Sequence, residues 1–102
     1  MSEVRFDGRV AIVTGAGGGL GKAHALLLAS RGAKVVVNDL GGARDGTGAG
    51  TTMAEQVVQE IKAAGGEALP DFHGVDTAEG GEAIVKTALD AYGKVDILIN
   101  NA

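Results

Sequence analysis

The sequence predicts an α/β fold of the Rossmann type, a doubly wound parallel sheet in the chain order β-α-β-α-β-α-β. Strand-like segments alternate with helix-like segments along the 102 residues. Each strand-like segment is a continuous apolar run, which is typical of parallel strands that helices bury on both faces. Right-handed crossovers place the first three strands in the order 3-2-1. If the fourth strand crosses to the other side of the first, the order becomes 3-2-1-4. We expect one domain over residues 1–102 and no second domain.

The first half of the chain holds two strands and the helix between them. Arg9–Gly15 is a short apolar run rich in β-branched residues, as in a buried strand. Leu20–Ser30 is rich in alanine and leucine, and Arg31-Gly32 after it is a helix stop. Ala33–Asp39 is a second apolar run and predicts the second strand. Leu40–Gly50 follows as a loop that is long for a strand-to-helix connection.

The second helix has a start signal, an apolar stripe and a stop signal. Thr52 and Glu55 have the spacing of a capping box, in which each side chain satisfies a free backbone N–H at the helix start. Gly65-Gly66 ends the helix. Apolar residues recur between these signals at the spacing of one helix face, which predicts an amphipathic helix. They are Ala54, Val57, Val58, Ile61 and Ala64.

The last third of the chain predicts a weak strand, a third helix and a fourth strand. Glu67–Val75 is the weaker strand, and Pro70 within it indicates a place near a sheet edge. The third helix ends at Gly93, and Lys94–Ala102 is the fourth strand. The helix is marked by apolar residues at helical spacing, namely Ile84, Val85, Ala88, Leu89 and Ala91.

The composition excludes several classes of function. The net charge is −4 and the lysines and arginines are scattered, so a nucleic-acid partner is not expected. Cysteine is absent, and His24 and His73 lack the spacing of metal ligands, so no metal site is expected. The first residues contain no apolar core of a secretory signal, and no apolar run reaches the length of a membrane span. We therefore expect a soluble cytoplasmic protein with no membrane partner.

The stretch VTGAGGGLGKA joins the first strand to the first helix. A phosphate at such a turn would meet free backbone N–H groups and the positive end of the helix dipole. Gly15 permits the sharp turn out of the strand, and Gly19 lets the backbone approach a pyrophosphate. Gly21 lets the helix pack closely on the sheet. A purely structural turn is the alternative, but the position between a buried strand and a helix favours a dinucleotide site.

The spacing of these glycines narrows the class of site. A P-loop needs serine or threonine after its lysine, whereas Lys22 is followed by Ala23, so that interpretation fails. The general pattern G-x-G-x-x-G, begun at Gly15, would need a glycine where Leu20 stands. The pattern that fits is T-G-x-x-x-G-x-G, beginning at Thr14.

Asp39 ends the second strand about 20 residues beyond the turn, where an acidic residue binds the adenosine ribose. Its carboxylate can accept hydrogen bonds from both ribose hydroxyls and would repel a 2′-phosphate. Asp39 therefore favours NAD over NADP as the cofactor. A solvated loop aspartate is the alternative. Arg44 could neutralise a 2′-phosphate, but it lies well inside the predicted loop.

With TGAGGGLG, NDLGG and ILINNA, the chain resembles the short-chain dehydrogenase/reductase family along essentially all of its residues. Family members are usually more than twice as long, so the resemblance implies a truncated, amino-terminal part of such a protein. A narrower resemblance is carried by RFDGRVAIVTGAGGGLG, VVVNDLGG and GGEAIVKTALDAYGKVDILINNA. It is to the (3R)-hydroxyacyl-CoA dehydrogenase unit of peroxisomal multifunctional β-oxidation enzymes and bacterial relatives. That resemblance implies NAD-dependent oxidation of a 3-hydroxyacyl-CoA.

The resemblance also implies which residues surround the cofactor. The glycine turn would lie against the pyrophosphate and the nearby ribose, Asp39 with the Leu40 backbone would hold the adenosine ribose, and Asn100 would tie strands together. The end of the third strand would flank the adenine, and the end of the chain would approach the nicotinamide-side ribose. In this order the implied cofactor residues are Gly15, Gly18, Gly19, Leu20, Gly21, Asp39, Leu40, Gly74, Val75, Asn101 and Ala102.

The chain departs from the family pattern in two places. Relatives commonly carry an aspartate two residues before Val75 for the adenine amino group, where this chain has His73. Either the imidazole or Asp76 could make that contact, or it could be lost. The family also places a serine and a Tyr-x-x-x-Lys pair after NNA, and these 102 residues contain no such set. Tyr92 is the only tyrosine, and the fourth residue after it is Asp96. The resemblance thus implies no catalytic residue here and a packing role for Tyr92.

Three functions remain open at this point. The leading hypothesis is the NAD-binding portion of an oxidoreductase whose full-length parent acts on a small-molecule substrate. The alternatives are an isolated nucleotide-binding module and a structural fragment without catalytic activity. The fourth strand is the most apolar and would form an open sheet edge. We therefore expect a homo-oligomer, or pairing of this strand with another segment.

Overall fold

The computed structural model describes residues 5–39, 53–74 and 77–101. Four parallel strands form one sheet in the order β3-β2-β1-β4, so the predicted order 3-2-1-4 is confirmed. Val13 at the end of β1 is level with Val37 of β2 and Ile99 of β4. The strands are β1 (Val10–Val13), β2 (Lys34–Asn38), β3 (Glu67–Asp71) and β4 (Ile97–Ile99).

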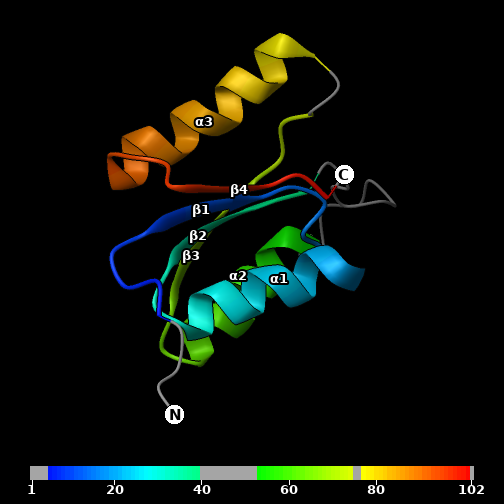
Figure 1. Cartoon of the computed structure of the whole chain (residues 1–102). Coiled ribbons are helices and arrows are strands. Elements are labelled where there is room, and N and C mark those ends of the chain that lie inside the picture. The colour runs from blue at the N-terminus through cyan, green and yellow to red at the C-terminus, as the bar shows by residue number, and fades with distance from the viewer. Residues whose placement is uncertain (1–4, 40–52, 75–76, 102) are drawn as a thin grey trace.

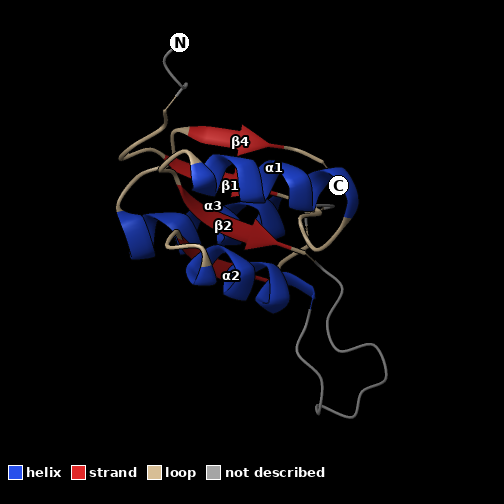
Figure 2. Cartoon of the chain, turned by 90° about the horizontal axis from the view of Figure 1, so that it is seen from below, coloured by secondary structure: helices blue, strands red, loops and turns tan. Residues whose placement is uncertain are grey.

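Helices cover both faces of this sheet, as the doubly wound prediction requires (Figure 1). Helices α1 (Gly19–Ser30) and α2 (Met53–Ala63) lie side by side on one face, and α3 (Ala78–Tyr92) covers the other. Seen from below, α1 and α2 lie over the strands (Figure 2). In the described ranges, no helix is long and apolar enough to cross a membrane.

The core has two layers, one on each side of the sheet. Because successive strand residues point to opposite faces, β1 contributes to both layers. Ala11 and Val13 join the layer under α1 and α2, while Val10 and Ile12 join the layer under α3. All four residues are buried, which is why the strand has a continuous apolar sequence rather than an alternating one.

The stop signals predicted at Arg31-Gly32, Gly65-Gly66 and Gly93 follow the ends of α1, α2 and α3. The start of α3 has a cap that the sequence analysis did not predict. Thr77 caps α3 by accepting the Gly80 N–H at 3.0 Å. At the other end Gly93 has φ +83°, a left-handed conformation that suits glycine, and its N–H donates to the Leu89 carbonyl. The predicted capping box of α2 includes Thr52, which lies outside the described residues, as does the predicted loop Leu40–Gly50.

All four strands are shorter than the sequence predicts, and the difference is largest for β3 and β4. The strand expected over Glu67–Val75 ends at Asp71, because the Asp71 carboxylate takes the N–H of His73 at 3.0 Å and turns the chain out of the sheet. The strand expected over Lys94–Ala102 covers only Ile97–Ile99. Before it, Asp96 bonds to Val10 twice, because its side chain accepts the Val10 N–H at 2.9 Å and its own N–H donates to the Val10 carbonyl at 2.8 Å.

Pro70 occupies the edge position predicted for it. β3 pairs with β2 alone among the described strands, and Pro70 is level with Val37. A proline lacks the N–H that a second neighbouring strand would need. The other edge is β4, where Leu98 is 61% exposed.

Candidate cofactor site

The carboxyl ends of the strands meet the start of α1 at one edge of the sheet (Figure 1, right). The segment between β1 and α1 is held there by backbone bonds to both neighbouring strands. The N–H of Thr14 donates to the Ile99 carbonyl at 3.0 Å, and the N–H of Ala16 donates to the Asn38 carbonyl at 2.8 Å. The turn is therefore fixed to β4 on one side and to β2 on the other.

The turn itself has the conformation that its glycines permit. Gly15 has φ +61° and Gly19 has φ +56°, both in the left-handed region that side chains other than glycine rarely adopt. Gly18 is the N-cap of α1 and no side chain caps the helix there. The first turn also contains no acidic residue. The helix thus begins with backbone N–H groups that lack a capping side chain, an arrangement that suits an anion.

Gly21 lets the helix approach the turn closely. A Cβ there would strike the carbonyl oxygen of Gly15 and would lie 2.8 Å from Nδ2 of Asn101. The sequence predicted close packing of the helix on the sheet. The structure shows that the atoms nearest to Gly21 belong to the turn and to the segment after β4 instead.

Asp39 contacts the glycine turn directly. Its Oδ2 accepts a hydrogen bond of 2.7 Å from the backbone N–H of Gly17. A Cβ on Gly17 would strike this carboxylate and would come within 2.8 Å of Cβ of Met53. Sequence reasoning gave Gly17 no role, because it lies outside the glycine pattern and nothing in the spacing reveals that Asp39 reaches it. This hydrogen bond ties the residue after β2 to the glycine turn.

Thr14 links the turn to the end of β4. Its buried side chain accepts the N–H of Asn101 at 2.9 Å, and its hydroxyl lies 3.2 Å from Oδ1 of Asn100. The side chain of Asn101 in turn lies 3.4 Å from the carbonyl of Gly15. Asn100 therefore ties two strand ends together as predicted, and Asn101 is placed beside the glycine turn.

Asp71 forms a buried polar cluster at the end of β3 that sequence reasoning missed. Oδ2 accepts from Nδ2 of Asn38 at 2.8 Å and from the N–H of His73, and Oδ1 lies 2.8 Å from Nδ1 of His73 and 3.0 Å from the Thr87 hydroxyl. Burial raises the pKa of Asp71, but these hydrogen bonds outweigh it and hold the pKa below the ordinary aspartate value. The carboxylate is thus ionised at neutral pH.

Of the other cofactor residues predicted from the sequence, the structure describes Leu20 and Gly74. Leu20 is 70% exposed in the first turn of α1. Gly74 is half-buried, and its carbonyl oxygen lies where a Cβ on Gly80 would be. Four residues of the sequence-based hypothesis are outside the described ranges: Leu40, Val75, Asp76 and Ala102.

Tyr92 lies away from this site and has the packing role expected of it. It packs against the core layer under α3, and Nζ of Lys34 lies 5.6 Å from the centre of its ring. Lys34 begins β2, so this contact is at the opposite end of the strands from the glycine turn. Burial and the nearby Glu67 carboxylate raise the pKa of Tyr92. A tyrosine so placed does not reach a cofactor on the turn.

The sheet order and the glycine turn that opens α1 define a Rossmann-like α/β domain. The family model described as short chain dehydrogenase matches residues 9–102. The chain belongs to this family of oxidoreductases.

Individual relatives agree with this assignment. The chain is 55% identical over 101 residues to the peroxisomal multifunctional enzyme type 2 of Mus musculus, covering 99% of this chain and 13% of the relative. A short chain dehydrogenase from Mycobacterium avium matches with a TM-score of 0.87 and 52% identity, over 94% of this chain and 34% of that one. A 7α-hydroxysteroid dehydrogenase complexed with NADH and 7-oxo glycochenodeoxycholic acid matches with a TM-score of 0.79 and 39% identity, over 92% and 33%. The chain thus spans between 13% and 34% of the length of each.

Proposed function

We propose that this chain is the NAD(H)-binding portion of a short-chain oxidoreductase. The parent reaction is hydride transfer between NAD and the alcohol of a 3-hydroxyacyl-CoA type of substrate. The observation that carries the proposal is the hydrogen bond from the Gly17 N–H to Oδ2 of Asp39. It places an acidic side chain that suits ribose hydroxyls directly beside a turn that suits a pyrophosphate.

The residues present fit a dinucleotide. Cβ atoms on Gly17 or Gly21 would fill space that the turn needs, and the N-terminus of α1 has no capping side chain. A carboxylate has about four lone-pair positions. Asp39 can therefore accept hydrogen bonds from a ribose while one of its oxygens also accepts the Gly17 N–H.

Each part of the site has a role in binding. The N–H groups around Gly18, Gly19 and Leu20 would hold the pyrophosphate, and Asp39 with Leu40 would hold the adenosine ribose. Gly74 and Val75 would flank the adenine, while Asn101 and Ala102 would approach the other ribose. NAD, when bound, supplies the hydride acceptor. The residues of this chain bind and orient it, and none of them is proposed to move a proton of the substrate.

The substrate class rests on the resemblance of several stretches of the sequence to hydroxyacyl-CoA dehydrogenase units, and the 55% identity to the peroxisomal multifunctional enzyme type 2 supports it. This chain spans only 13% of that relative, and none of the residues of the candidate site is assigned to the substrate. A 3-hydroxyacyl-CoA is therefore proposed for the parent enzyme. The chain by itself is expected to bind NAD and NADH without turnover.

The preference of the site for NAD over NADP tests this function. Wild-type chain, Asp39→Ala and Asp39→Asn would be titrated with both dinucleotides by calorimetry. We expect the wild type to bind NAD at least about 10-fold more tightly, because the carboxylate repels the 2′-phosphate. Asp39→Ala should weaken NAD binding by about 10-fold, the size of a hydrogen bond to a charged group.

Asp39→Asn is the matched control, because an asparagine oxygen can still accept the Gly17 N–H while the negative charge is gone. It should keep the wild-type melting temperature and lose most of the discrimination against NADP. An unchanged NAD-to-NADP ratio in both variants would remove Asp39 from the site. Equal affinity for AMP, ADP and NAD would indicate a general nucleotide-binding module, and no binding of any nucleotide would indicate a structural fragment.

A further inference from the structure

The ring of His73 is held by a buried carboxylate. Asp71 has a side chain that is 2% exposed, whereas that of His73 is 52% exposed. Nδ1 of the ring lies 2.8 Å from Oδ1 of Asp71. In the part of the chain that the structure describes, Asp71 is the residue that bonds to this ring.

The surroundings of Asp71 determine which nitrogen of the ring carries a hydrogen. The carboxylate receives donors at both oxygens, from Asn38, from Thr87 and from the backbone of His73. These donors favour its ionised, acceptor-only form. An acceptor 2.8 Å from Nδ1 requires the hydrogen to be on Nδ1. In the neutral ring Nε2 then has the lone pair and is an acceptor.

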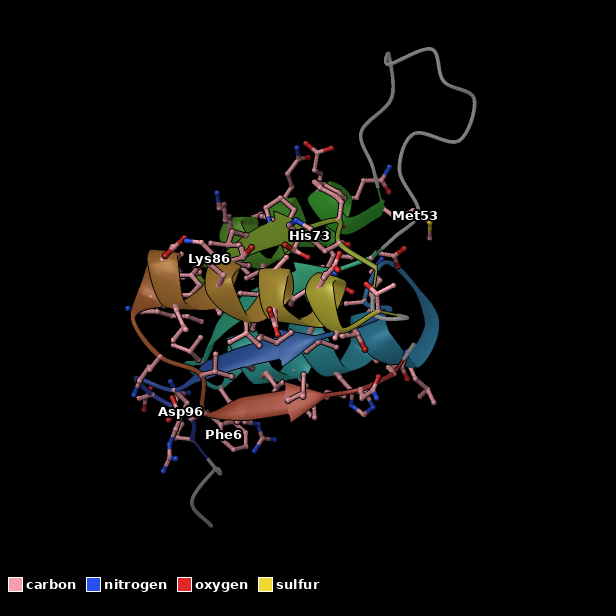
Figure 3. All side chains as sticks on the ribbon, turned by 90° about the horizontal axis from the view of Figure 1, so that it is seen from above. Phe6, Met53, His73, Lys86 and Asp96 are labelled. Atoms are coloured by element: carbon pink, nitrogen blue, oxygen red, sulfur yellow. The ribbon has the colours of Figure 1, made fainter. Side chains whose placement is uncertain are left out.

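The ring lies at the same edge of the sheet as the proposed ribose site. The N–H of Asp39 donates to the carbonyl of Asp71 at 3.0 Å, and the carbonyl of His73 accepts from Nδ2 of Asn38 at 2.9 Å. Figure 3 shows His73 alongside α3, on the segment that leaves β3. A base attached to a ribose at Asp39 would therefore lie near the end of β3 and this half-exposed ring.

We propose that His73 is a specificity-determining residue that selects adenine through Nε2, and that Asp71 is the positioning residue that fixes its tautomer. This inference rests on the proposed NAD site. The exocyclic 6-amino group of adenine donates a hydrogen bond, which the Nε2 lone pair accepts. In hypoxanthine a carbonyl oxygen replaces this amino group, so two acceptors would face each other. The site therefore discriminates between NAD and nicotinamide hypoxanthine dinucleotide.

Two substitutions of His73 separate this role from a structural one. In His73→Asn, the side-chain amide can still donate to Asp71 from about the position of Nδ1, but nothing replaces Nε2. In His73→Gln, the longer side chain can place its amide oxygen near the position of Nε2. The 102-residue chain and both variants would be titrated with the two dinucleotides at pH 8, where histidine side chains are ordinarily neutral.

We expect the wild type to bind NAD about 3- to 10-fold more tightly than the hypoxanthine analogue, the range of one hydrogen bond. His73→Asn should bring this ratio close to 1, and His73→Gln should retain most of it. Long-range ¹H–¹⁵N spectra should show the Nδ1-protonated tautomer of His73 in the wild type. The Nε2-protonated tautomer, or an unchanged ratio in His73→Asn, would overturn the inference while leaving NAD binding intact. No binding of either dinucleotide would overturn the proposed function as well.

Discussion

Gly21→Ala is the substitution that tests the geometry of the glycine turn most severely. The added Cβ would strike the carbonyl oxygen of Gly15 and would lie 2.8 Å from Nδ2 of Asn101. The end of the Asn101 side chain can move away. The Gly15 carbonyl cannot, because backbone hydrogen bonds at Thr14 and Ala16 hold the turn on both sides. Relief of the clash therefore requires α1 to shift away from the turn.

The expected cost follows from two opposing effects. Overpacking a tight site costs about 1–3 kcal/mol. The higher helix propensity of alanine offsets up to about 1 kcal/mol of this. Because the added Cβ meets backbone rather than a movable side chain, the cost lies in the upper half of that range, and the net loss is about 1–2 kcal/mol in the free energy of unfolding. For a domain of this size that corresponds to a fall in melting temperature of roughly 4–16 °C. NAD affinity should fall by at least about 10-fold, since small displacements of binding groups carry large penalties.

Gly81→Ala is the matched control. Gly81 also lies near the start of a helix, α3, but a Cβ there would meet no atom within 4 Å. Only the propensity gain remains, so the melting temperature should rise by roughly 2–8 °C with NAD affinity unchanged. Thermal unfolding followed by circular dichroism and calorimetric titration give both quantities. A Gly21→Ala chain with wild-type stability and wild-type NAD affinity would refute the packing argument.

Two further predictions concern Asp71 and the β4 edge. Because the folded-state pKa of Asp71 is depressed, its stabilisation is present above the unfolded pKa of about 3.9 and is lost as pH falls through the lower folded value. Thr87→Val removes one donor, so NMR titration should show the Asp71 carboxyl titrating at higher pH, and an unchanged midpoint would contradict this. Leu98, Val85 and Leu89 are exposed apolar residues on β4 and α3, and we propose that this edge pairs with a second copy of the chain. Sedimentation velocity should then show concentration-dependent association that Leu98→Glu weakens, whereas a stable monomer at high concentration would argue against it.

The arrangement of the fold could be predicted because it depends on patterns that are local in the sequence. β1 and β2 are continuous apolar runs, since helices bury both faces of these strands. The glycines after each helix mark its end, as Gly93 does in the left-handed conformation. With these elements placed, the handedness of crossovers leaves few orders for a parallel sheet.

The polar contacts of the site could not be predicted, because they join residues that are distant in sequence. The bond between Asp39 and Gly17 spans 22 positions, and that between Asn38 and Asp71 spans 33. Neither pair has a spacing signature. The early end of β3 was missed for a different reason: it depends on a local contact, in which the Asp71 side chain takes the backbone N–H of His73 two residues later. The sequence identified Asp39 and the turn as a candidate site but not the contact that joins them.

A crystal structure of this chain with NADH tests the central claim most directly. We predict that the diphosphate will lie within hydrogen-bond distance of the backbone N–H groups at the start of α1, with the adenosine ribose against the Asp39 carboxylate. A cofactor bound elsewhere, or a turn whose N–H groups face away from the diphosphate, would contradict the account.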